Sequence, residues 1–106
     1  MYASVRTYRF ANGSVDDLMH RIDRDFAEAL SREPGFLGYQ AIDLGSGKLC
    51  TISLFASAGQ AEDSNETAAA WVAEELGDFD VERMGVIGGE VMVSRAREGM
   101  LEPAHH

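Results

Sequence analysis

The stretch "FLGYQAIDLGSGKLCTISLFA", residues 36 to 56, consists of two runs rich in aromatic and β-branched residues around a short glycine-bearing turn. This pattern is typical of a β-hairpin, so residues 36–44 and 49–56 are expected to be neighbouring strands. Cys50 alternates with Ile52 and Leu54 in the second run, and we expect these side chains to face the helices. The elements on either side of the hairpin decide the fold.

Ahead of the hairpin, the sequence predicts one strand and one helix. Residues 2–10, "YASVRTYRF", alternate and carry the residue types that suit a pleated surface. Ser14 begins a capping-box pattern, and apolar residues then recur every three or four positions over 15–30. The Pro-Gly pair at 34–35 is expected to end the helix.

Behind the hairpin, the sequence predicts a second helix and a fourth strand. A second capping box starts a helix over 57–79, with a break expected near Asp63 and Ser64. The run "VIGGEVMVSRA", residues 86–96, is typical of a strand with a bulge or a close approach at its glycines. Residues 97–106 show no pattern and are expected to form a flexible tail.

The predicted order is βαββαβ within one domain, residues 1–96. Such a chain forms an α+β, ferredoxin-like fold, a four-stranded antiparallel sheet with two helices on one face, and we expect its middle pair of strands to be parallel. The strands carry apolar residues that are too numerous for a sheet with one open face. A homodimer joined through the sheet face is therefore expected, and the residues behind this expectation are Tyr2, Tyr8, Phe10, Phe36, Phe55 and Met92.

Composition excludes several classes of protein. The net charge is −9 and the nine Lys and Arg residues are scattered, which opposes binding to nucleic acid. No apolar run approaches the roughly 20 residues that span a membrane, and Arg6 and Arg9 occupy the place where a signal peptide needs its apolar stretch, so we expect a cytoplasmic protein without membrane contact. Cys50 is the only cysteine, so neither a disulfide within the chain nor a cysteine metal site is expected.

Three segments, "EPGFLGYQAID", "TISLFASAGQAEDSNETAAAWV" and "GEVMVSR", resemble the antibiotic biosynthesis monooxygenase family of the dimeric α+β barrel superfamily. The resemblance implies a dimeric α+β barrel. Members of this family include cofactor-independent oxygenases of polyphenols and haem-degrading oxygenases. The haem-degrading members use an axial histidine on the second helix, but this chain has no histidine between Ser57 and Phe79, and His20 is expected to point away from the apolar stripe of the first helix. We therefore expect no haem and no other cofactor.

The resemblance also implies site residues. An asparagine and a tryptophan on the second helix recur in the cofactor-free members, and Asn65 and Trp71 match them by type, as a donor to a substrate oxygen and a surface for stacking. Tyr39, Arg6 and Glu90 are the further candidates for binding substrate. Four of these five residues have a structural alternative: Trp71 packs on the sheet, Asn65 binds backbone, and Arg6 and Glu90 form a cross-strand ion pair.

Three functions remain open on the sequence. The first is a cofactor-independent monooxygenase, or a related enzyme, that acts on a small aromatic or quinol-like ligand. The second is a noncatalytic module that binds or senses a small molecule. The third is a structural domain that only dimerises. No nucleophile–base pair, GxGxxG motif or P-loop points to another class of enzyme.

Overall fold

The structure is a computed structural model that describes residues 1–96. The predicted tail, residues 97–106, lies outside the described residues. Strands and helical segments follow in the predicted order, with the bounds β1 Tyr2–Phe10, α1 Val15–Arg21, η1 Ile22–Ala27, α2 Glu28–Leu30, β2 Phe36–Gly45, β3 Lys48–Phe55, α3 Ala58–Glu75, η2 Gly77–Phe79 and β4 Val81–Glu90.

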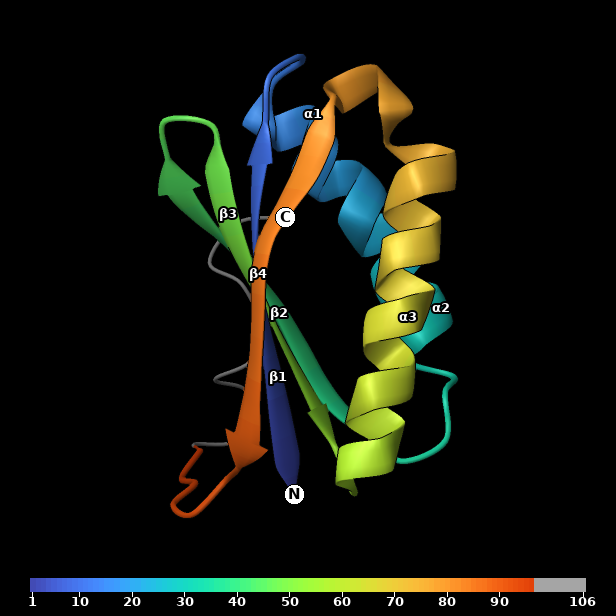
Figure 1. Cartoon of the computed structure of the whole chain (residues 1–106), viewed down its shortest axis with the longest axis vertical. Helices are drawn as coiled ribbons and strands as arrows, with labels where there is room; N and C mark the ends of the chain where they lie inside the picture. The colour runs from blue at the N-terminus through green and yellow to red at the C-terminus, as the bar shows by residue number, and fades with distance from the viewer. Residues whose placement is uncertain (97–106) are drawn as a thin grey trace.

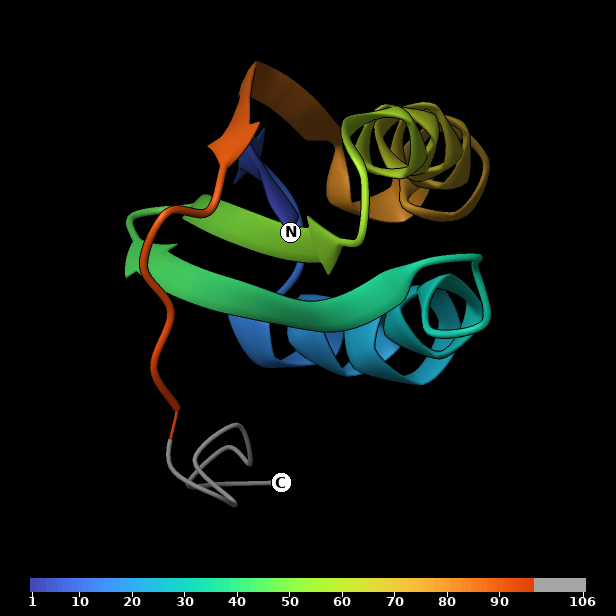
Figure 2. The same cartoon turned by 90° about the horizontal axis from the view of Figure 1, so that it is seen from below.

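The strands form one sheet in the order β2-β3-β1-β4, and the helical segments cover one of its faces (Figures 1 and 2). Viewed from below, α3 lies over the β1–β4 half of the sheet, while α1, η1 and α2 lie over the half that contains β2 (Figure 2). The ferredoxin-like fold is confirmed. The expectation of a parallel middle pair is wrong, because β1 and β3 are antiparallel neighbours. Each βαβ crossover does return a parallel strand, but another strand lies between the two.

Both predicted helix starts are confirmed by their caps. Ser14 Oγ accepts a hydrogen bond from the Asp17 amide (3.1 Å), and Ser57 Oγ accepts one from the Gln60 amide (3.3 Å). The predicted break in the second helix is wrong, since α3 is continuous and the Ser64 hydroxyl donates to the Ala61 carbonyl within the helix. Within residues 1–96, no helix is long and apolar enough to cross a membrane.

The first helical segment changes its winding partway along. α1 passes directly into η1, a π-helix, which is followed by the short α2. Ile22 and Phe26 lie four residues apart in η1, and both are buried. The apolar stripe predicted for this segment is therefore carried across the π-helical part and still meets the sheet.

The face of β3 that meets the helices is the opposite of the predicted one. Leu49, Thr51, Ser53 and Phe55 are buried beneath the helices, while Cys50 and its alternating partners are only partly buried on the open face. Alternation divides the residues of this strand between two faces, but it does not show which face meets the helices. Thr51 and Ser53 take the inner face because both contact the buried side chain of Arg6.

The open face of the sheet is aliphatic rather than aromatic. The aromatic residues that suggested a dimer lie mainly on the helix side, where Tyr8 is 5% and Phe55 1% exposed. The open face instead carries branched aliphatic side chains from all four strands, since cross-strand pairing and alternation place these residues together: Val5, Ile42, Ile52, Leu54 and Ile87. An uncovered apolar face therefore exists, but it is built from other residues than expected.

The fourth strand begins five residues earlier than predicted and ends at Glu90. Asp80 precedes it in a left-handed conformation (φ 53°), and η2 reverses the chain direction ahead of it. The register with β1 shifts between Thr7 and Tyr8. Met92 was predicted to lie in this strand, but it follows the strand and is 84% exposed.

The assignment of faces predicts a stability difference between two leucines. Leu49→Ala removes a side chain that is 2% exposed and should lower the free energy of unfolding by about 2–5 kcal/mol, because it leaves a cavity under the helices. Leu37→Ala, at a position 52% exposed, should lower it by less than about 1 kcal/mol. Urea unfolding followed by circular dichroism measures both values, and equal losses would contradict the assignment.

Candidate functional site

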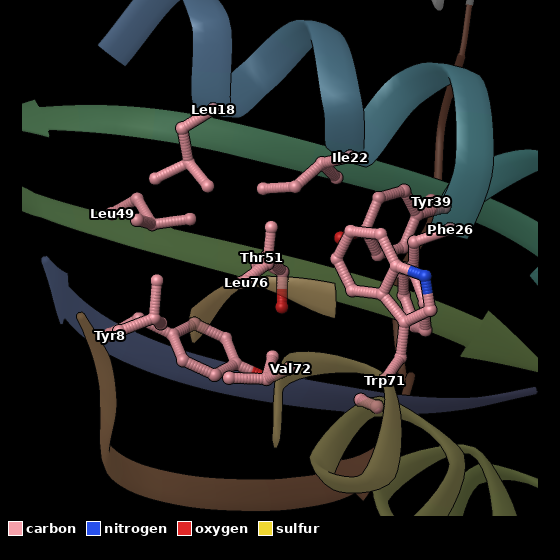
Figure 3. A pocket seen from close by; sticks show the side chains of 12 residues that line it. Tyr8, Leu18, Ile22, Phe26, Tyr39, Leu49, Thr51, Trp71, Val72 and Leu76 are labelled. Atoms are coloured by element: carbon pink, nitrogen blue, oxygen red, sulfur yellow. The ribbon is translucent and has the colours of Figure 1, made fainter. Parts of the chain in front are cut away.

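A pocket lies between the helical layer and the sheet, and its walls are mainly apolar (Figure 3). Leu18 and Ile22 extend toward it from the first helical segment, and Trp71 and Val72 from α3 (Figure 3). The space within it, including the part open to solvent, is about 330 Å³, but only about 20 Å³ admits the centre of a water molecule. The remaining lining residues are Tyr8, Phe26, Tyr39, Leu49, Thr51, Ala68, Leu76 and Val81.

One end of the pocket is aromatic. The Phe26 and Trp71 rings lie 5.2 Å apart between centroids with an interplanar angle of 41°, and Phe26 meets Tyr39 edge-on at 5.6 Å. Such pairs contribute about 0.5–1.5 kcal/mol beyond the area they bury. Trp71 is only partly buried, so its indole forms a wall of the pocket as well as packing against Phe26.

Beneath this end lies a buried cation. Arg6 extends from β1 and is 0% exposed. Its guanidinium donates to Thr51 Oγ1 (3.2 Å), the Ser64 carbonyl (3.2 Å), Asn65 Oδ1 (3.3 Å) and Ser53 Oγ. Ser4 Oγ also donates to Asn65 Oδ1, at 2.7 Å. These contacts link β1, β3 and α3 through one side chain.

The positive charge of Arg6 has no anionic partner within residues 1–96, where every ion pair involves other groups. Burial lowers the pKa of Arg6 from its usual value, as expected for a cation removed from water. Neutral oxygen atoms satisfy its N–H groups, and the ring of Phe26 lies 5.9 Å from the guanidinium carbon. The charge is therefore solvated by the protein but not neutralised.

The two tyrosines of the pocket are held in the neutral form. Burial raises the pKa of Tyr39 and of Tyr8 above the usual value, and the nearby charge of Arg6 opposes this effect without cancelling it. At neutral pH both phenols therefore keep their protons. Each has a hydroxyl that can donate a hydrogen bond, and neither is an effective base.

The structure separates the predicted site residues into three groups. Trp71 and Tyr39 line the pocket. Arg6 and Asn65 lie together in the buried polar cluster behind it and do not line it. Glu90 lies outside the pocket lining, at the exposed end of β4.

The predicted ion pair between Arg6 and Glu90 is wrong. Arg6 lies opposite Val86 in the β1–β4 register, whereas Glu90 lies opposite Tyr2. The nearest partner of the Glu90 carboxylate is the N-terminal amine, at 3.5 Å. The pair fails because β4 starts earlier than predicted, which moves Glu90 to the far end of the strand.

Sequence reasoning missed two residues that connect the pocket to the buried cluster. Phe26 packs on Trp71 and Tyr39, and Thr51 both lines the pocket and accepts a hydrogen bond from Arg6. Phe26 had a signal, since it belongs to the apolar stripe of the first helix. Thr51 had none, because its importance depends on which face of β3 is inward.

Solved structures with this fold are known. The haem degrader MhuD from Mycobacterium tuberculosis is 17% identical over 91% of this chain and 100% of its own, with a TM-score of 0.68. A protein from Deinococcus radiodurans, proposed to be an antibiotic biosynthesis monooxygenase, is 17% identical over 93% of this chain and 100% of its own, with a TM-score of 0.66. A dimeric ferredoxin-like protein from an uncultured marine organism is 13% identical over 91% and 98%, with a TM-score of 0.67.

These similarities confirm the ferredoxin-like fold of the single chain. Neither a protein-family model nor a curated protein matches the chain by sequence. At these identities the similarity shows a shared fold and does not assign an activity to this chain.

The pocket does not fit a haem, the group found in MhuD. Its lining residues include no histidine, cysteine or methionine, the side chains that most often bind haem iron. Tyrosinate is a further haem ligand, but burial raises the pKa of Tyr8 and Tyr39 and so disfavours that form.

The unneutralised charge predicts different outcomes for two substitutions at Asn65. Asn65→Leu removes an acceptor of both Arg6 and Ser4 and should lower the free energy of unfolding by about 2–3 kcal/mol. Asn65→Asp keeps the acceptor and adds a negative charge beside the guanidinium, so stability should equal or exceed that of the wild type.

Thermal unfolding at neutral pH compares both variants with Asn12→Leu, an exposed control in the loop after β1 that should have little effect. A loss in Asn65→Asp as large as that in Asn65→Leu would contradict the account of Arg6.

Proposed function

We propose that the protein binds a small, flat aromatic molecule in the pocket beside Trp71 and oxidises it with dioxygen without a cofactor. The observation that carries this proposal is the aromatic end wall, in which Trp71, Phe26 and Tyr39 surround apolar space next to a buried cation. The similarity in fold to a proposed antibiotic biosynthesis monooxygenase supports it.

The chemistry suits an electron-rich phenol or quinol. Such a ring supplies electrons to dioxygen once its hydroxyl has lost a proton, so no metal or flavin is needed. In the oxidation of a phenol to a quinone, one oxygen atom becomes the new carbonyl and the other leaves as water, and the ring supplies all the electrons. The protein must bind the ring, exclude water and favour the anion.

The residues divide these tasks. Trp71 offers a face for stacking, and the neutral hydroxyls of Tyr39 and Thr51 are donors for a substrate oxygen. Arg6 lies behind Thr51 and supplies positive charge that favours a bound phenolate over the phenol. Asn65 acts by orienting Arg6 rather than by contacting the ligand.

A noncatalytic binding module is the second candidate. The observation that favours it is the character of the lining, because none of the residues that line the pocket is a carboxylate or a histidine able to take a proton from a phenol. The same pocket would then bind an aromatic ligand without turnover. The two candidates agree on the ligand class and differ in oxygen consumption.

The site is proposed to work within a homodimer that forms through the open face of the sheet. The branched aliphatic residues on that face are exposed to different degrees, with Ile87 70% and Ile42 39% exposed in the single chain. Apolar patches of this kind mark protein interfaces. The similarity to a dimeric ferredoxin-like protein supports a second copy of this chain as the partner.

Oxygen uptake with a panel of phenols and hydroquinones tests the enzyme, and quenching of the single tryptophan tests binding. We expect uptake with at least one compound, with a rate about 10-fold lower in Tyr39→Phe, since a donor to the substrate oxygen is lost. Tyr2→Phe removes a tyrosine hydroxyl outside the pocket lining and should leave the rate unchanged. Saturable quenching without uptake would favour the binding module, and the absence of both would contradict both candidates.

The dimer predicts a change of mass on a single substitution. The wild type should have twice the mass of its 11.5 kDa chain by light scattering at micromolar concentration. Ile52→Glu places a charge on the open face between Val5 and Gln40 and should yield monomers. Ala73→Glu adds the same charge on the exposed side of α3 and should stay dimeric. A monomeric wild type would refute the proposal.

A further inference from the structure

The pocket is too narrow in this structure to admit an aromatic ring. Only about 20 Å³ is open to the centre of a water molecule, room for about one water, whereas a cavity that takes up benzene measures about 150 Å³. Some of the walls must therefore move before a ligand enters. The floor is the hydrogen-bonded sheet, so the helical walls are the candidates for movement.

The two helical walls are joined weakly. Within the described part of the chain, the hydrogen bond from Arg21 Nη1 to the Glu75 carbonyl (2.7 Å) is the only one between residues 15–30 and α3. Apolar side chains supply the other contacts, including the packing of Phe26 on Trp71. Apolar and aromatic contacts of this kind can separate and reform without breaking either helix.

The bond from Arg21 is well placed to control the gap. Its neighbours at positions 18 and 22 line the pocket from one helix, and those of Glu75 at positions 72 and 76 line it from the other. The Arg21 guanidinium also lies 5.5 Å from the centre of the Phe79 ring, just beyond the end of α3. The bond and the ring together anchor one helical wall to the C-terminal end of the other.

The electrostatics of this anchor are favourable but reversible. The last carbonyls of a helix lack partners within it and carry partial negative charge. α3 has no basic residue in its own last turn, so Arg21 of α1 supplies the cation there. The contact is exposed to solvent, and water can replace it when the helices separate.

We propose that ligands enter the pocket between η1 and α3 and that Arg21 is the latch that keeps this entrance closed. The π-helical winding of η1 lies directly after Arg21, and π-helical turns occur often at functional sites. Trp71, on the α3 side of the entrance, becomes more exposed each time the latch opens.

Acrylamide quenching of Trp71 fluorescence tests the latch without any ligand, so the result is independent of whether the proposed function holds. Arg21→Ala should raise the quenching constant about two-fold or more, because the loss of the hydrogen bond and of the contact with Phe79 favours the open form. Arg24→Ala removes an exposed arginine whose ion pair is with its neighbour Asp25 (3.0 Å), and it should quench like the wild type.

Arg21→Gln is the second variant. Its shorter side chain keeps an N–H donor, so this variant should fold even if Arg21→Ala does not. Its quenching constant should lie between those of the wild type and Arg21→Ala, at a temperature where circular dichroism shows native structure. A constant equal to the wild-type value in the folded Arg21 variants, or an equal rise in Arg24→Ala, would overturn the proposal.

Discussion

A single buried cation organises the interior of this protein. Removing a guanidinium from water costs several kcal/mol unless its N–H groups find acceptors, and this chain supplies neutral oxygens rather than a carboxylate. Those acceptors come from a neighbouring strand and from the helix above, so the position of Arg6 fixes how α3 lies on the sheet. The strand faces, the polar half of the interior and the site all depend on this contact.

The interior is consequently divided into a polar half and an apolar half. Serine, threonine and asparagine gather around Arg6, while the space next to them is lined by aliphatic and aromatic side chains. Thr51 belongs to both halves. A ligand in the apolar half would lie near a positive charge that it does not touch, an arrangement that provides electrostatic selectivity and leaves the wall free for stacking.

Local chemistry accounts for the part of the fold that could be predicted. The caps at Ser14 and Ser57 and the glycine-bearing hairpin turn depend on neighbouring residues, so the sequence contains them directly. The inward face of β3 and the start of β4 depend on register, and a shift of one residue reverses every side chain in a strand. An arginine in a strand usually points to solvent. The burial of Arg6 in β1 is therefore evident only from its contacts in the folded chain.

The same limit applies to the site. Trp71 and Tyr39 were recognisable as residues suited to an aromatic ligand, and both line the pocket. Asn65 was also recognisable by type, but its partner proved to be Arg6.

The strand order has a further consequence for how the protein is made. β1 pairs with β3 and with β4, and the pocket includes Tyr8 from the first strand and Val81 from the last. A ribosome must therefore deliver nearly the whole described chain before the site can close, so folding during synthesis should be late and governed by contacts between distant residues.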